Sequence, residues 1–144
     1  MGFFKNFFGK RSTPEEIERE KEHHLLHSTT EKLILDCERL IKKLNSFNDV
    51  KDQNTRLKIN WVVNRVAEIK NHLEESHSYL KEENLAYFEK ELFEANKIIN
   101  KNFETIYERL DFLKRIKRIT SSEVSYFKSL VDNIQRLIKE LNKK

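Results

Sequence analysis

Glycine and proline are nearly missing from this sequence. Both glycines, Gly2 and Gly9, and the only proline, Pro14, lie among the first fourteen residues. From Glu15 onward no residue type forces a helix break or a positive φ angle, so the chain is predicted to be almost entirely helical, with turns made by Asn, Asp and Ser. The same absence excludes a phosphate-binding loop or a dinucleotide fingerprint, because both need glycines between a strand and a helix.

Cysteine and long apolar runs are also scarce. The single cysteine, Cys37, forms neither an internal disulfide nor a cysteine-based zinc site, and it falls at a predicted core position. This is typical of a buried thiol in a reducing cytoplasm. No apolar stretch approaches the ~18 residues that cross a bilayer, and the N-terminus lacks the continuous apolar region of a secretory signal. The sequence therefore predicts a cytoplasmic protein.

What the sequence does contain is charge and apolar residues at helical spacing. Charged residues make up 36% of the 144 residues and hydrophobic residues 38%, without a block of one sign. A disordered chain would lack this periodicity, and the length fits one domain with a real core. The net charge of +4 is too modest to indicate an anionic partner strongly.

The strongest helical pattern runs from Leu85 to Ile119. Its apolar residues recur in steps of three and four, the period of one face of an α-helix. They are Leu85, Phe88, Leu92, Ala95, Ile99, Phe103, Ile106, Leu110 and Leu113. Further apolar residues flank this face, so it is wide enough to contact two or more neighbours. We predict that it forms the central helix of a bundle.

Three more helices are predicted around it. The first starts at Thr13 and Pro14, runs to about Phe47 and is expected to kink or break near residues 27–30, where Ser28 and Glu31 form a second capping pattern. The next runs from about Asp52 to a turn at either 76–78 or 82–84, and the last follows a cap at residues 120–123. The predicted fold is an all-α, antiparallel up-down four-helix bundle over residues 12–144. An extended dimer of two hairpins fits the same helices.

Residues 1–11 form a distinct N-terminal segment, here called the phenylalanine segment. As a helix, this segment places four aromatic rings on one side and polar groups on the other. The rings belong to Phe3, Phe4, Phe7 and Phe8, and the cations are Lys5, Lys10 and Arg11. Such a pattern is typical of a short interfacial helix whose rings enter the headgroup region while its cations meet anionic lipid. Docking on a partner protein, or on the chain's own bundle, fits the same pattern.

The opening residues FFKNFFGKRSTPEEIERE resemble the start of ESCRT-III proteins. In that family a short amphipathic segment with phenylalanines and a basic Gly-Lys stretch lead through Thr-Pro into a long helical hairpin. The resemblance covers about the first 20 residues. It implies membrane remodelling by polymerisation, with the four phenylalanines of the segment inserting into lipid.

The densest basic cluster lies at the end of the third predicted helix and consists of Lys114, Arg115, Lys117 and Arg118. Cations at a helix C-terminus complement the helix dipole, which accounts for the cluster structurally. A nucleic-acid-binding bundle that contacts phosphates through this cluster is the alternative function, although no known nucleic-acid-binding motif accompanies it.

Histidines supply the remaining candidate chemistry. His23 and His27 are one helical turn apart, and antiparallel pairing of the first two helices brings them level with His77. The pairs Glu20–His23 and Glu74–His77 have the Glu-x-x-His spacing of ferritin-like di-iron bundles, but no inward carboxylate stands out on the other two helices. Surface histidines are the simpler interpretation, so no metal is assigned.

Two Arg–His spacings, Arg19 to His24 and Arg65 to His72, resemble the loose motif of HEPN ribonucleases. That resemblance rests on two residues each time and implies an RNA-cleaving pair. The prediction we favour is a non-enzymatic interaction or scaffold protein without a cofactor or catalytic residue. It associates through the phenylalanine segment with a membrane surface, at the inner face of the membrane, or with a partner protein, and it is compatible with a homo-oligomer.

Overall fold

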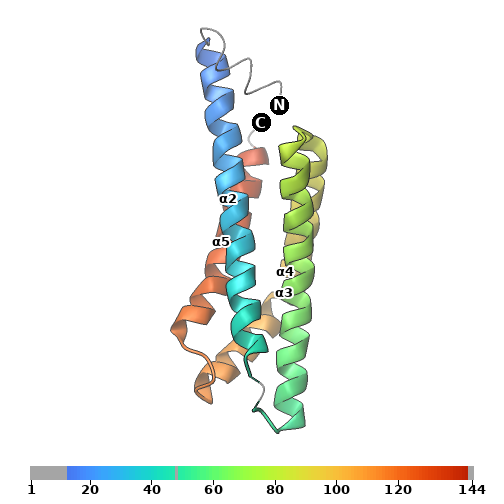
Figure 1. Cartoon of the computed structure of the whole chain (residues 1–144), viewed down its shortest axis with the longest axis vertical. Coiled ribbons are helices and arrows are strands. Elements are labelled where there is room, and N and C mark those ends of the chain that lie inside the picture. The colour runs from blue at the N-terminus through green and yellow to red at the C-terminus, as the bar shows by residue number, and fades with distance from the viewer. Residues whose placement is uncertain (1–12, 48, 143–144) are drawn as a thin grey trace.

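The computed structural model describes residues 13–47 and 49–142. Within these ranges the chain forms four helices, and no strand occurs in them. They are α2 (Pro14–Asn45), α3 (Gln53–Lys81), α4 (Leu85–Arg115) and α5 (Ser121–Asn142). α2 packs against α3 and α5, and α4 packs against the same two helices, so the four form a bundle (Figure 1). The all-helical class expected from the sequence is confirmed.

The core of the bundle lies along the apolar faces that the periodicity predicts. Seven of the nine residues of the α4 face are buried. The exceptions are Leu85, which begins α4 and is 45% exposed, and Phe103, which is 38% exposed and stacks on Phe127 and Tyr107. On α5 the core includes Leu130 and Leu137, which lie three positions after the buried Phe127 and Ile134.

Polar side chains fix the helix starts. Thr13 accepts a hydrogen bond from the Glu16 backbone N–H, and the Glu16 carboxylate accepts one from the Thr13 backbone, which is the reciprocal capping box predicted from the sequence. Asp52 caps α3 and Asn84 caps α4. Thr120 donates to Glu123 at the start of α5, again where the sequence predicts a cap.

Two helix ends use a positive φ angle without glycine, which corrects the sequence-based expectation. Glu83 after α3 has φ 61° and Lys117 after α4 has φ 63°. At each end the next residue donates back over five positions, from Asn84 to Tyr79 O and from Arg118 to Leu113 O. These are Schellman motifs, which require a left-handed residue, and this glycine-poor sequence places charged residues there. α4 therefore ends at Arg115 rather than at the predicted Ile119, and the α3–α4 turn lies at 82–84.

α2 extends beyond α5, and the first half of α2 is largely exposed. It runs without interruption through residues 27–30, so the predicted break and second cap are wrong. Ser28 instead donates its hydroxyl to Leu25 O within the helix. α2 has 32 residues and α5 has 22, and Figure 1 shows the start of α2 extending past the end of α5. Between residues 14 and 32 only Thr30 is buried.

Candidate metal centre

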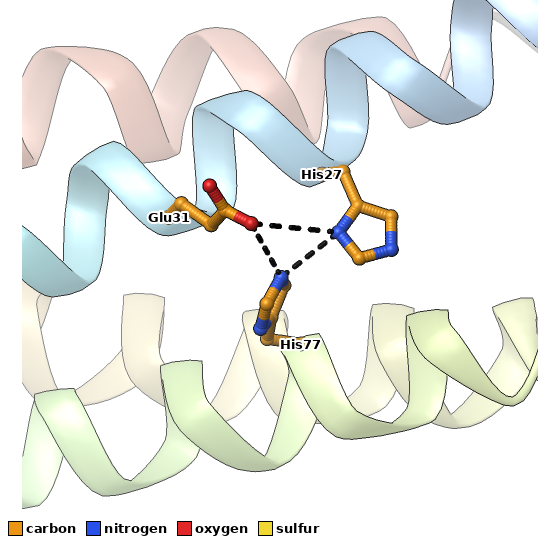
Figure 2. A group of neighbouring side chains, drawn as sticks. All are labelled: His27, Glu31 and His77. Atoms are coloured by element: carbon orange, nitrogen blue, oxygen red, sulfur yellow. Dashed lines mark hydrogen bonds and ion pairs between the residues drawn. The ribbon is translucent and has the colours of Figure 1, made fainter.

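Three ligand-type side chains converge between α2 and α3. His27 and Glu31 lie one turn apart on α2, because residues four positions apart share a helix face. His77 lies on the facing side of α3 and points between them (Figure 2). We call these residues the histidine–glutamate triad. Among the described residues it is the group of His, Cys, Asp and Glu whose ligand atoms come together.

The donor atoms of the triad lie within 4.8 Å of one another. His77 Nε2 lies 2.9 Å from His27 Nδ1 and 3.4 Å from Glu31 Oε1, and His27 Nδ1 lies 3.9 Å from the same carboxylate oxygen. A proton on His77 Nε2 would face both acceptors at once. In that protonation state His77 Nε2 is the donor, and the lone pairs of His27 Nδ1 and Glu31 Oε1 are the two acceptors.

Both histidines of the triad have a pKa below the ordinary value of histidine. Burial, together with the neighbouring His77 and His23, lowers the pKa of His27, although Glu31 opposes this. Burial and the Lys81 ammonium lower the pKa of His77, again against Glu31. Because the charged imidazolium forms are disfavoured, the contacts of His77 with His27 and with Glu31 are hydrogen bonds that involve neutral rings.

The triad opens on a groove between α2 and α3, here called the α2–α3 groove. It has a volume of about 500 Å³ and is lined partly by apolar and partly by charged side chains. The lining residues are Glu31, Ile34, Leu35, Glu38, Glu74, His77, Ser78 and Lys81. Lys70 pairs with Glu38 at 3.8 Å and with Glu74 at 3.6 Å. The triad therefore has solvent access on its Glu31 side, where that side chain is 63% exposed.

Sequence reasoning identified two members of the triad and missed the third. The level of His27 with His77 agrees with the predicted pairing of the first two helices. His23 lies beside His27, with ring centroids 5.1 Å apart. Glu20 and Glu74 are not in the triad, because Glu74 faces Lys70. Glu31 takes the carboxylate position instead, and the signal was present as a His-x-x-x-Glu spacing that we interpreted as a helix cap.

The Arg–His pairs of the ribonuclease resemblance have other partners in the structure. Arg65 lies 2.7 Å from Glu68, one turn along α3. His72 Nδ1 hydrogen-bonds Glu91 on α4 at 2.6 Å. Arg19 is exposed near the start of α2 and lines a different groove from the one at the triad.

The basic cluster at the end of α4 is divided by its contacts. Arg118 Nη1 bonds Asp49 Oδ2 at 2.8 Å and so joins the α4–α5 turn to the α2–α3 turn. Arg115 lies 3.4 Å from Asp111 within α4. Lys114, Arg115 and Lys117 are exposed. The cluster therefore serves partly as a structural contact and partly as an exposed basic surface.

The phenylalanine segment, with Phe3, Phe4, Phe7, Phe8, Lys5, Lys10 and Arg11, lies outside the described residues. Where the described chain begins, the bundle has a second groove, here called the end groove, of about 300 Å³. Its apolar lining comes from all four helices: Leu26, Leu80, Leu85 and Leu141. Along 13–47 and 49–142, no helix combines the length and apolar character needed to span a bilayer.

Comparison with known protein families, curated proteins and solved structures finds no match for this chain.

Proposed function

We propose that this protein is a non-enzymatic helical interaction protein that associates peripherally with an anionic membrane surface. The observation that carries the proposal is the grouping of Phe3, Phe4, Phe7 and Phe8 on one side of the N-terminal segment, opposite its cations. In this proposal the chain acts at the cytoplasmic face of a membrane. Homo-oligomerisation strengthens attachment, because eleven residues bind lipid weakly alone.

The arrangement of the helix ends supports this proposal. In this proposal, consecutive helices run in opposite directions, as in an up-down bundle, because the turns at 82–84 and 116–120 are short. The end groove draws its lining from the first half of α2, the α3–α4 junction and the last residues of α5, which is consistent with that alternation. In the sequence, the phenylalanine segment directly precedes α2, whose first half has only one buried residue, Thr30.

Exposed apolar residues continue the contact surface into α2. Ile17 is 38% exposed and Leu25 is 59% exposed. Both lie in the part of α2 that precedes its buried face. We infer that the phenylalanine rings supply most of the binding free energy by leaving water, while Lys5, Lys10 and Arg11 favour anionic lipid.

Vesicle co-sedimentation of the full chain tests the proposal. We expect pelleting with phosphatidylserine-containing vesicles, weaker pelleting with phosphatidylcholine alone, and loss of pelleting when all four phenylalanines are replaced by serine. The control replaces two exposed leucines elsewhere, Leu35→Ser and Leu57→Ser, and should pellet like the parent. Equal pelleting of the serine variant and the parent would remove the membrane proposal.

The end groove is the rival partner for the phenylalanine rings within the chain. If the rings docked there, the parent would not pellet and the serine variant would melt at a lower temperature, because apolar burial would be lost. If the parent does not pellet with vesicles and has the same melting temperature as the serine variant, the result would point instead to a partner protein. The three outcomes therefore separate membrane, self and partner contact.

Nucleic-acid binding is the second candidate, favoured by the exposure of Lys114, Arg115 and Lys117 on one helix end. It predicts salt-sensitive binding to RNA or DNA that is lost when these three residues become glutamine. Lys97→Gln, Lys101→Gln and Lys128→Gln together remove the same charge elsewhere and serve as the control. If neutralising the cluster leaves the affinity for RNA and DNA unchanged, the nucleic-acid proposal is wrong and the cluster has only a structural role at the end of α4.

A further inference from the structure

We propose that the histidine–glutamate triad binds one divalent transition-metal ion of the zinc class. His27 Nδ1, His77 Nε2 and Glu31 Oε1 are the protein ligands, and water from the α2–α3 groove fills the remaining position. Two imidazoles and one carboxylate form a recognised zinc donor set with an open coordination site. The proposal is independent of membrane association.

The spacing of the donor atoms fits a metal ion. Their separations of 2.9, 3.4 and 3.9 Å bracket the ~3.3 Å between ligands of a tetrahedral zinc site. A point equidistant from the three atoms lies about 2.0 Å from each of them. Zinc takes imidazole nitrogen at about 2.0–2.1 Å and carboxylate oxygen at about 2.0–2.2 Å. That point lies in the plane of the three donor atoms, so a tetrahedral ion with a water ligand requires His27 Nδ1 and Glu31 Oε1 to move closer together from their separation of 3.9 Å.

The imidazole rings of the triad can each offer a nitrogen lone pair to an ion. Each ring then carries its proton on its other ring nitrogen. With the proton on His77 Nε2, coordination requires that proton to move to Nδ1, a change of tautomer rather than a net loss of a proton. The ion would then lie between His77 Nε2 and the two atoms that it now contacts, His27 Nδ1 and Glu31 Oε1.

The charges around the triad favour a cation overall. Glu31, Glu38 and Glu74 line the α2–α3 groove, against the single lysine of its lining, Lys81. Lys70 also pairs with two of these carboxylates from the edge of the groove. A bound divalent ion would offset the excess of carboxylates, and it would repel Lys81, whose long side chain can turn to solvent.

Metal binding would join the exposed half of α2 to α3. Only Thr30 is buried in that half, and His27 and Glu31 lie on either side of it. An ion held by both helices would oppose separation of α2 from α3 at this level, because it binds the packed arrangement and not the separated one. We expect the backbone amides of residues 20–31 to exchange more slowly with solvent when the ion is bound.

Calorimetric titration of the full chain with Zn²⁺ tests the site. We expect one ion per chain, a rise in melting temperature with Zn²⁺, and visible absorption typical of tetrahedral cobalt when Co²⁺ replaces it. His77→Gln should lower the affinity by more than about 100-fold, since changes to outer-shell partners alone cost about 10–100-fold. Glu31→Gln should lower the affinity about tenfold or more. The Glu31 side chain is 63% exposed, so this variant should fold like the parent, and circular dichroism checks this directly.

His24→Gln is the matched control, because His24 is an exposed histidine on the same helix outside the triad. This variant should bind Zn²⁺ like the parent. Equal affinity of the parent and the folded Glu31→Gln and His77→Gln variants would overturn the proposal and leave only adventitious surface binding. Absence of Zn²⁺ binding by the parent would overturn it as well.

Discussion

At the scale of single residues, the structure contains one buried charge that does not favour folding. Asp36 on α2 is 4% exposed, and its Oδ2 has no hydrogen-bond partner. Burial raises the pKa of its carboxyl group, against a hydrogen bond from Ser129 and the charges of Lys32 and Arg39. A carboxylate with only part of its hydrogen bonds made costs free energy at neutral pH.

Asp36→Asn should therefore stabilise the protein at neutral pH by on the order of 1 kcal/mol. A carboxyl pKa raised in the folded state means that wild-type stability falls as pH rises from 3.8, the ordinary value, through the folded-state value. The advantage of the variant should be full at pH 7 and shrink toward pH 4. Thermal melts over this range measure it, with the exposed Asp132→Asn as control. A variant less stable than the parent at pH 7 would contradict the assignment.

Cys37 should resist thiol reagents until the protein unfolds. Its side chain is fully buried, and burial together with Asp36 raises the pKa of the thiol, so almost no thiolate forms at pH 8. Labelling with a disulfide reagent should be slow in the parent and immediate in denaturant. Leu25→Cys, placed where the side chain is 59% exposed, provides the fast control. Similar rates at both positions would show that the core opens readily.

How far the sequence predicts individual residues depends on what places them. Helical periodicity placed Cys37 in the core and His27 level with His77, because both follow from the backbone repeat. It did not place Glu31 in the triad, because the same residue also fits a capping pattern and only side-chain geometry separates the two. Asp36 was not identified either, since a charged residue is assumed to face solvent.

At the scale of helices, the sequence predicts the helix starts more closely than it predicts the ends of α3 and α4. Ser, Thr, Asp and Asn caps are visible in a sequence because their side chains accept backbone hydrogen bonds. The Schellman motifs at Glu83 and Lys117 lack their usual glycine, so nothing in the sequence marks them. For this reason the sequence pattern does not choose between two positions for the end of α3, and it continues α4 beyond Arg115.

Lys117→Gly should stabilise the protein by about 1 kcal/mol. A residue with a side chain at φ 63° is strained by contact between Cβ and the backbone, and glycine removes that contact. Glu83→Gly should act similarly at the end of α3. Chemical unfolding measures both, and Lys114→Gly, inside α4, should destabilise by about 1 kcal/mol. Destabilisation by Lys117→Gly would mean that the helix end does not hold the left-handed residue.

At the scale of the whole molecule, the bundle has one well-covered and one sparsely covered part. The apolar face of α4 and that of the second half of α2 are mostly buried. The first half of α2, which extends beyond α5, has few buried residues. The histidine–glutamate triad and the end groove both lie in the sparsely covered part. The sequence predicts the helix content, but it does not predict that α2 continues as one helix through residues 27–30.

The central claim is that the phenylalanine rings of residues 1–11 enter a lipid surface, and a single tryptophan placed among them tests it most directly. In Phe7→Trp combined with Trp61→Phe, the new ring is the only tryptophan of the chain. We predict that its emission shifts to the blue on adding phosphatidylserine-containing vesicles and is quenched by lipids with brominated acyl chains. Emission that stays the same with and without vesicles would contradict the claim.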